Sequence, residues 1–284
     1  MTDHDHHDGD FATDLSALLS RRRMLTGLGL AGLTGLVGVA ALAQGRPPMG
    51  PGAQPDVTGL GADGQSCVAQ PQETNGPFPA DGTNVKDGQT VNALTLAGVI
   101  RSDIRGSIGD LTGTAEGQAM TLTLDLVDVD AGCMPIAGLA IYIWHCDAGG
   151  RYSIYEVADR NDLRGMQIAD AGGRVQFTTI LPGTYRGRWP HVHFEVFRSA
   201  EAAVAGATPL LTGQLALPEA LATKRYAGDA RYADSLPNLS GQSLASDGIF
   251  GDSTPLQLAA QLVKVSRDDA GGLAVGTQVG LTGL

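Results

Sequence analysis

The stretch from Ile141 to Phe197 limits the possible folds most, because it alternates short apolar runs with glycine-rich turns. Its runs of aromatic and β-branched residues lie at positions 141–146, 174–180 and 191–196. Such runs are typical of β-strands. The turn Asp147-Ala148-Gly149-Gly150 follows the first run and leads to Tyr152, which we expect to be exposed. The stretch therefore predicts a β-rich domain.

Two histidines in the third run are spaced for metal binding. Side chains alternate between the two faces of a strand, so His191 and His193 share one face while Val192 and Phe194 point to the other. Two imidazoles on one face can share a metal ion, although such pairs also occur in structural roles. The tyrosines at positions 152 and 185, each placed after a glycine-containing turn, make a metal site a more specific prediction.

Several motifs of this stretch resemble those of the intradiol ring-cleavage dioxygenases, non-haem iron(III) enzymes that open catechol rings. The matching segments are Trp144-His145-Cys146-Asp147-Ala148 with Gly150 and Tyr152-Ser153, Leu163-Arg164-Gly165 with Gln167, Thr178-Thr179-Ile180 with Pro182-Gly183 and Tyr185, and Arg188 with His191 and His193. The resemblance extends from about Cys67 to Phe250. It implies a mononuclear ferric ion held by four side chains, Tyr152, Tyr185, His191 and His193.

Tyrosine and histidine suit this chemistry. Phenolate is a hard anionic oxygen donor that favours iron(III), whereas two histidines and one carboxylate are typical of iron(II). By the resemblance, Tyr152 stays bound, while Tyr185 leaves the metal when a catechol binds and helps to take the substrate's proton. Arg188 corresponds to an arginine that stabilises negative charge on the ring, and Gln214, at a more variable spacing, to a glutamine that hydrogen-bonds in the pocket. The implied reaction cleaves the bond between the two hydroxylated carbons with O2.

The other aromatic and histidine side chains of the stretch have simpler interpretations. We expect Tyr142, Tyr155, Trp144 and Trp189 to be packing or wall residues, and His145 to be a hydrogen-bonded structural histidine. Two other functions stay open. The chain could be a secreted β-sandwich protein that binds phenolic compounds without turnover, or it could hold zinc in a hydrolytic or structural site, although tyrosinates are unusual zinc ligands.

Residues 1–43 are predicted to be a twin-arginine signal peptide. Arg21-Arg22-Arg23 precedes a weakly apolar, glycine-rich stretch, and Ala41-Leu42-Ala43 has the pattern of a cleavage site. This predicts export by the Tat pathway to the periplasm or the extracellular space, with no stable membrane insertion after cleavage. We expect 44–66 to be a flexible linker and 67–284 to be one catalytic domain. Three histidines lie in the signal and are not candidate ligands: His4, His6 and His7.

The chain is acidic. Its formal net charge of -11 becomes -9 once the five aspartates and three arginines of residues 1–43 are removed. An acidic chain without a basic run argues against nucleic acids and anionic membrane surfaces as partners. The expected partners are a small catechol and O2, and a homo-oligomer stays open.

The cysteines Cys67, Cys133 and Cys146 predict one disulfide and one free thiol in an oxidising compartment. Cys133 precedes the strand that Cys146 ends, and an extended segment of this length holds these two apart. Cys67 therefore pairs with Cys133 or with Cys146, and we favour Cys133. No C-x-x-C spacing indicates a cysteine-based metal site.

The remaining patterns complete the predicted fold. We expect half-buried strands at 94–104 and 120–127, a loop or short helix at 199–207, and a covering loop that carries Tyr226 and Tyr232 at the surface or an interface. Together the elements predict an all-β, antiparallel β-sandwich whose long loops carry a mononuclear metal site. Only five residues separate Tyr185 from His191, and from this short connection we infer an open pocket for varied or bulky catechols.

Overall fold

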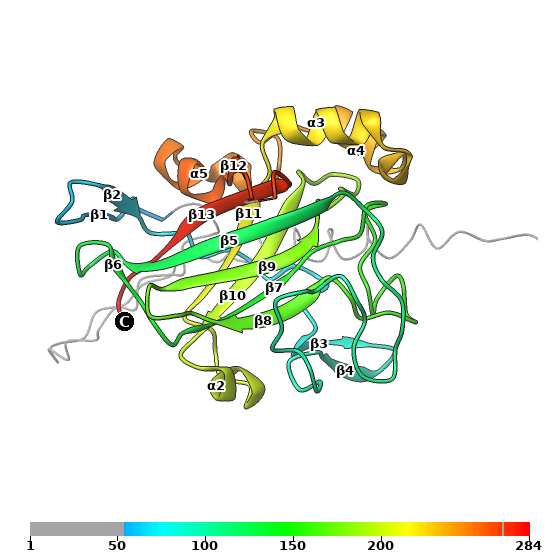
Figure 1. Cartoon of the computed structure of the whole chain (residues 1–284), viewed down its shortest axis with the longest axis horizontal. Helices are drawn as coiled ribbons and strands as arrows, with labels where there is room; N and C mark the ends of the chain where they lie inside the picture. The colour runs from blue at the N-terminus through cyan, green and yellow to red at the C-terminus, as the bar shows by residue number, and fades with distance from the viewer. Residues whose placement is uncertain (1–53, 269) are drawn as a thin grey trace, which may run out of the picture. The chain divides into compact units, whose positions relative to one another are not determined.

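Two β-sheets pack against each other across a shared apolar core (Figure 1). The computed structural model describes residues 54–268 and 270–284, so the predicted signal and the first part of the predicted linker lie outside the described residues. All but one of the strand pairs within these two sheets are antiparallel, which confirms the predicted β-sandwich.

The first sheet has four antiparallel strands in the order β11-β10-β7-β8. These are Leu211–Ala216, His191–Phe197, Ala140–Trp144 and Arg164–Ile168. Strands β7, β10 and β11 are buried along their whole length. A strand that is buried on both faces is apolar at nearly every position, which explains the unbroken run Ile141-Tyr142-Ile143. The predicted strands at 141–146 and 191–196 are thus confirmed to within two residues.

The second sheet has the order β12-β13-β5-β6, and β9 also pairs with β5. Its strands are Lys264–Arg267, Leu273–Leu281, Ala119–Asp128, Met134–Pro135 and Arg174–Ile180. Strands β5 and β9 confirm the predictions at 120–127 and 174–180. Strand β13 was not predicted. It pairs with β5 along the whole of its length, and this pair is parallel, whereas the other strand pairs of the two sheets are antiparallel.

Alternate side chains from both sheets form the core. Phe194 of β10 lies in the same apolar cluster as Leu122 of β5 and Phe177 of β9. Because neighbouring side chains of a strand point to opposite faces, this packing directs His191 and His193 to the outer face of the first sheet. A shift of one residue in register would turn both histidines into the apolar core. The core therefore decides which face carries the site.

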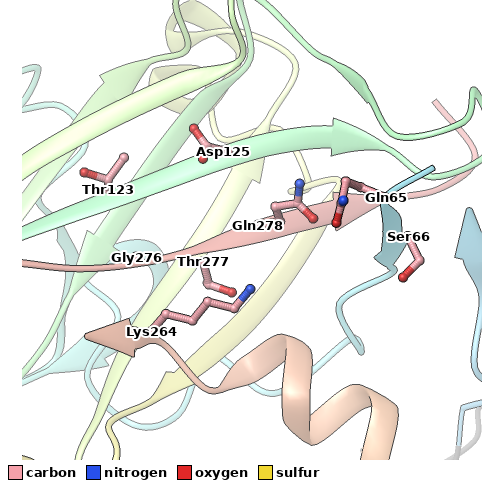
Figure 2. Close-up of a pocket in the computed structure, with 8 residues that line it drawn as sticks. All are labelled: Gln65, Ser66, Thr123, Asp125, Lys264, Gly276, Thr277 and Gln278. Atoms are coloured by element: carbon pink, nitrogen blue, oxygen red, sulfur yellow. The ribbon is translucent and has the colours of Figure 1, made fainter. Parts of the chain in front are cut away.

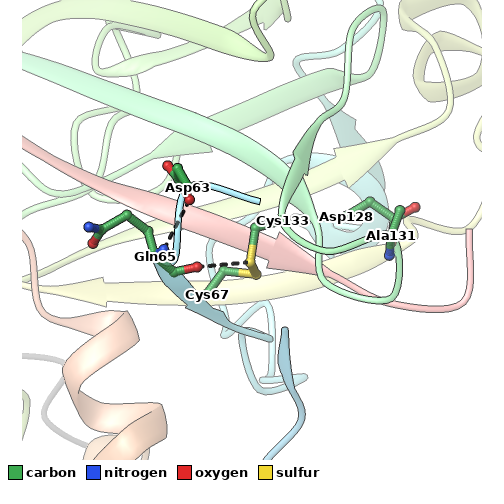
Figure 3. The surroundings of a disulfide bond; sticks show 6 residues. All are labelled: Asp63, Gln65, Cys67, Asp128, Ala131 and Cys133. Atoms are coloured by element: carbon green, nitrogen blue, oxygen red, sulfur yellow. Dashed lines mark hydrogen bonds between the residues drawn. A yellow bond between two sulfur atoms is a disulfide. The ribbon is translucent and has the colours of Figure 1, made fainter. Parts of the chain in front are cut away.

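A disulfide ties an N-terminal hairpin to the connection between β5 and β6 (Figure 3). The hairpin consists of β1 (Thr58–Leu60) and β2 (Ser66–Val68). Cys67 is bonded to Cys133, which confirms the favoured pairing and leaves Cys146 as a buried free thiol. Residues 58–66 of the predicted linker 44–66 belong to this hairpin, in which β1 pairs with β2.

The double substitution Cys67→Ser, Cys133→Ser is expected to lower the free energy of unfolding by about 4 kcal/mol, since the bond closes a long loop in the unfolded chain. The two cysteines are separated by 66 positions in the sequence. Urea unfolding with and without reductant measures the loss. Reductant should lower the midpoint of the wild-type protein and leave that of the variant unchanged. Equal midpoints for the variant and the oxidised wild type would contradict the prediction.

The segment at 94–104 is not the half-buried strand that its alternating pattern predicts. It consists of turns and isolated bridges, because its first backbone N–H groups find local acceptors: that of Leu94 donates to Oδ1 of Asn92 at 2.9 Å. A separate two-stranded sheet precedes it, formed by β3 (Asp81–Lys86) and β4 (Gln89–Asn92). The short helix α2 (Ala200–Val204) lies within the predicted loop or helix at 199–207.

After β11 the chain forms a mainly helical segment. Its elements are α3 (Glu219–Gly228), η1 (Ala230–Tyr232), α4 (Ser235–Ser240), η2 (Phe250–Asp252) and α5 (Pro255–Gln261). The prediction that Tyr226 and Tyr232 lie at the surface or an interface is wrong. Both are buried, and their rings stack with centroids 4.9 Å apart, because the segment folds back onto the sandwich. No helix in the described part of the chain has the length and apolar character to cross a lipid bilayer.

Candidate active site

The four predicted ligands come together beside the outer face of the first sheet. Strand β10 supplies His191 and His193, and two loops supply Tyr152 and Tyr185. The Nε2 atoms of the two histidines are 3.0 Å apart, and Oη of Tyr152 is 3.4 Å from Nε2 of His191. The ring centroids of Tyr152 and Tyr185 are 5.7 Å apart, and those of Tyr185 and His191 are 5.8 Å apart. Side chains from three separate places in the sequence thus form one cluster.

Asp147 shapes the loop that carries Tyr152. Its Oδ1 accepts two backbone N–H groups of the turn, each at 2.9 Å. Gly150 follows with a φ of 89°, and a Cβ added there would lie 2.6 Å from the carbonyl oxygen of Thr184. Glycine meets both requirements, the left-handed backbone and the close approach. The loops that carry Tyr152 and Tyr185 therefore pack backbone against backbone, which fixes the separation of the two rings.

Burial keeps both imidazoles neutral. Desolvation, assisted by the charge of Arg188, lowers the pKa of His191 to about 3. Desolvation also lowers the pKa of His193 well below its ordinary value. Nδ1 of His191 donates to the carbonyl oxygen of Trp189 at 2.5 Å, so the lone pair of this ring lies on Nε2. A neutral imidazole with an unprotonated Nε2 is the form that binds a metal ion.

The tyrosines are shielded from water to different degrees. Tyr152 is 1% exposed, so the expectation of an exposed side chain is wrong; the ring of Phe78 packs against it with centroids 5.0 Å apart. Burial raises the pKa of Tyr152 well above its ordinary value, and Tyr185 adds to the rise. Burial also raises the pKa of Tyr185, against the opposing effect of Arg188. A bound metal cation would lower both pKa values by stabilising the phenolates.

Arg188 lies between the cluster and two further polar side chains. Its Nη1 is 3.4 Å from Oη of Tyr185 and 3.5 Å from Nε2 of His191. Its Nε donates to Oδ2 of Asp247 at 3.0 Å, and its Nη2 donates to Oε1 of Gln214 at 2.6 Å. Burial alone would lower the pKa of Arg188, but Tyr185 and Asp247 together raise it. The structure thus places the predicted residues Arg188 and Gln214 at the cluster, and it adds Asp247, which sequence reasoning missed.

Residues 74–78 pass over the cluster. Gly76 has a φ of 72°, and a Cβ added there would lie 3.2 Å from Cε1 of His193. Nε2 of Gln214 donates to the carbonyl oxygen of Thr74 at 3.0 Å. The buried guanidinium of Arg164 donates to the carbonyl oxygens of residues 78 and 79 at 2.8 and 3.0 Å. Side chains of the first sheet therefore hold this segment at both ends.

The helical segment holds the loop that carries Tyr185. Tyr232 and Tyr226 donate their Oη–H groups to the carbonyl oxygens of residues 181 and 182, at 2.7 and 2.6 Å. Oγ of Ser235 accepts a backbone N–H from this loop at 2.9 Å and donates to a carbonyl oxygen of the loop that carries the other tyrosine, at 2.7 Å. The segment thus positions the cluster from outside the sandwich.

The other aromatic and histidine side chains have the structural surroundings predicted for them. His145 is buried, and its Nε2 lies 2.7 Å from Oγ1 of Thr179. The ring of Trp144 stacks on His193 with centroids 4.8 Å apart. The remaining three pack against neighbouring residues as predicted: Tyr142, Tyr155 and Trp189.

The donor atoms of the cluster fit a hard, trivalent metal ion. In residues 54–268 and 270–284, no group of three or more His, Cys, Asp and Glu side chains could hold a metal. The cluster contributes only two side chains of these types, and its other two donors are phenols. Two neutral imidazoles, together with two phenols that lose their protons on binding, provide two nitrogen and two anionic oxygen ligands. This donor set suits iron(III).

A separate hollow of about 350 Å³ lies on the second sheet (Figure 2). It is lined by polar side chains, among them Thr123 and Asp125 of β5, Lys264 of β12 and Gln278 of β13. Thr123 and Asp125 alternate along β5 with the core residue Leu124, so they lie on the outer face of this sheet. None of the predicted site residues lines this hollow.

Comparison with known proteins relates the sequence and the fold of the chain to dioxygenases. A sequence model of a family described as Dioxygenase matches residues 103–206, a range that contains Arg188 and all four predicted ligands. An intradiol ring-cleavage dioxygenase from Tetranychus urticae has the same fold: the TM-score is 0.56 over 76% of this chain and 95% of that chain, at 23% sequence identity. Residues 103–206 are thus similar to the Dioxygenase family, and the chain has the fold of an intradiol ring-cleavage dioxygenase.

Two curated dioxygenases match shorter segments. Hydroxyquinol 1,2-dioxygenase from Corynebacterium glutamicum is 30% identical over 77 residues, which cover 27% of this chain and 25% of that protein. The beta chain of protocatechuate 3,4-dioxygenase from Burkholderia cepacia is 33% identical over 84 residues, which cover 24% of this chain and 35% of that protein. The matched segments span well under half of either relative, so the substrate and the activity of this protein are proposals.

Proposed function

We propose that this protein is a non-haem iron(III) dioxygenase that cleaves a catechol-type ring between its two hydroxylated carbons and incorporates both atoms of O2. The observation that carries the proposal is the single cluster of Tyr152, Tyr185, His191 and His193, with Arg188 against it. The match to the Dioxygenase family supports an oxidoreductase of this kind.

The chain's own residues would have different roles in the proposed reaction. When bound, iron(III) supplies the Lewis-acid and redox chemistry that makes a catecholate ring reactive toward O2. Tyr152, His191 and His193, the more buried donors, would hold the metal. Tyr185, which is only partly buried, would be the fourth donor as a phenolate, the form that can take a substrate hydroxyl proton at its Oη. Arg188, whose Nη1 is 3.4 Å from that Oη, would stabilise the negative charge that develops on the ring.

Varied or bulky catechols are the proposed substrates, because the connection between Tyr185 and His191 is short and its residues Arg186 and Gly187 are exposed. Steady-state kinetics on a panel of catechols with different ring substituents tests this. Activity confined to protocatechuate would count against it.

The visible absorption spectrum of the purified, iron-loaded protein, recorded before and after addition of catechol, tests the proposed function. Tyrosinate bound to iron(III) should colour the protein red-brown, and catechol should shift the band and start oxygen uptake. A coloured protein that shifts with catechol but consumes no oxygen would be a phenol-binding protein without turnover. A colourless protein that takes up no iron would overturn the proposal altogether.

Export by the Tat pathway is a proposal that rests on the twin-arginine pattern of residues 1–43, which lie outside the described part of the chain. The disulfide supports it, because such bonds form in oxidising compartments. Replacement of Arg21, Arg22 and Arg23 by lysine should retain the protein in the cytoplasm. Cell fractionation measures this, and unchanged export would rule out the twin-arginine route.

A further inference from the structure

We propose that Asp247 is a positioning residue, which holds the guanidinium of Arg188 in the orientation that ring cleavage requires. Asp247 lies between α4 and η2 in the helical segment, outside the range 103–206 matched by the family model. The inference rests on the proposed function and extends it to a residue beyond the sandwich.

The carboxylate of Asp247 is fully enclosed, with its side chain 0% exposed. Its Oδ2 accepts Nε of Arg188 at 3.0 Å and the backbone N–H of Trp189 at 2.6 Å. Its Oδ1 accepts Nη2 of Arg188 at 3.4 Å and the backbone N–H groups of residues 249 and 250 at 2.9 and 3.2 Å. Because five donors from two parts of the chain bind this carboxylate, its orientation is fixed. The charge of Arg188 and these N–H groups lower the pKa of Asp247 although burial opposes them, so the carboxylate is ionised.

This carboxylate determines where the guanidinium of Arg188 points. Asp247 binds the edge formed by Nε and Nη2, and such two-point pairing fixes the plane of the planar group. The remaining nitrogen, Nη1, is therefore the one that faces Tyr185 and His191. Gln214 accepts only from Nη2, and one hydrogen bond does not fix a plane. Loss of the carboxylate should leave Arg188 charged and in place, but free to rotate away from the cluster.

The test is Asp247→Asn in the full-length, iron-loaded protein. We expect kcat to fall about 10- to 100-fold, as is typical for residues that orient a functional group. The dissociation constant for catechol, measured without oxygen, should change less than about threefold, because the iron ligands are untouched. In an Arg188→Lys background, the added Asp247→Asn substitution should cost less than about threefold, since residues that act as a unit are not additive. An equal loss in both backgrounds, or an unchanged kcat, would overturn the proposal.

Asp162→Asn is the matched control. Asp162 has a side chain that is 3% exposed and pairs with Arg160, so its substitution also breaks an ion pair of a buried carboxylate, but without contact to Arg188. We expect it to lower the melting temperature and leave kcat within about twofold. A comparable fall in kcat in this control would mean that general destabilisation, and not the orientation of Arg188, explains the effect of Asp247→Asn.

A second measurement separates this inference from the proposed function. If the wild-type protein turns over no catechol, the proposed function fails, but the orientation of Arg188 can still be measured. NMR of the metal-free, full-length protein with ¹⁵N-labelled arginine shows the Nε–H signal of Arg188, identified by its loss in Arg188→Lys. Exchange of this proton with solvent should be at least about tenfold faster in Asp247→Asn, because its buried acceptor is weakened. Equal exchange rates would show that Asp247 does not hold the side chain.

Discussion

Tyr185→Phe is expected to lower kcat for catechol cleavage by at least about 100-fold and to shift the visible absorption band of the iron-loaded protein. The substitution removes one atom, Oη, which we propose as both a metal ligand and the acceptor of a substrate proton. Loss of a positioned acid or base alone typically costs about 10²- to 10⁴-fold. Oxygen uptake and absorption spectroscopy on the same preparation measure the two effects. Full activity in this variant would mean that the ligand is wrongly assigned.

Tyr155→Phe provides the control for loss of a tyrosine hydroxyl. Oη of Tyr155 donates to Oδ1 of Asn84 at 2.8 Å and accepts the backbone N–H of Ala80 at 2.9 Å. The side chain is partly buried, like that of Tyr185, and has no hydrogen bond to the cluster. Its variant should keep activity within about twofold and leave the absorption band unchanged. If both variants lost activity equally, stability would be the common cause.

The central strands could be predicted from the sequence because their patterns are local. The apolar run around Ile143 and the alternation around His193 each indicate a buried strand without reference to any other segment. The pairing of β13 with β5 could not be predicted in the same way. Residues 273–281 do alternate apolar side chains, which is a signal for a strand, but their parallel alignment with β5 depends on a connection that spans about half of the chain. The alternation at 94–104 led to a wrong strand prediction. The side chain of Asn92 accepts the backbone N–H of Leu94, and a turn starts there.

Some residues of the candidate site could likewise be predicted from local sequence, whereas the roles of others depend on tertiary contacts. Tyr152 and His193 stand in short motifs whose residue types and spacing already indicate a metal site. Asp247 stands between Ser246 and Gly248, a setting typical of a surface turn, and nothing in it shows that the side chain is buried against Arg188. For the same reason, the sequence does not show that Tyr226 and Tyr232, predicted at the surface or an interface, are buried. The partners of such residues lie far away in sequence, so their roles become visible only in the folded chain.

Arg188→Lys is expected to lower kcat about 100-fold while the affinity for catechol, measured without oxygen, changes only a few-fold. Lysine keeps the positive charge, so the buried Asp247 retains a cationic partner and the variant should fold. Its single ammonium group cannot reach Asp247, Gln214 and Tyr185 together, as the three nitrogens of the arginine do. The stabilisation of charge on the reacting ring is lost, and removal of one such donor typically costs about 10²- to 10³-fold. Steady-state oxygen uptake and anaerobic titration measure the two constants separately.

Arg186→Lys is the matched control, because Arg186 is an exposed arginine two positions earlier in the same loop. We expect it to keep both constants within about twofold. A fall in affinity with kcat unchanged in Arg188→Lys would mean that Arg188 binds the substrate before reaction and does not act on the charge that develops during it. That result would favour an arginine that recognises an anionic group on the catechol, and it would narrow the proposed range of substrates to ring acids.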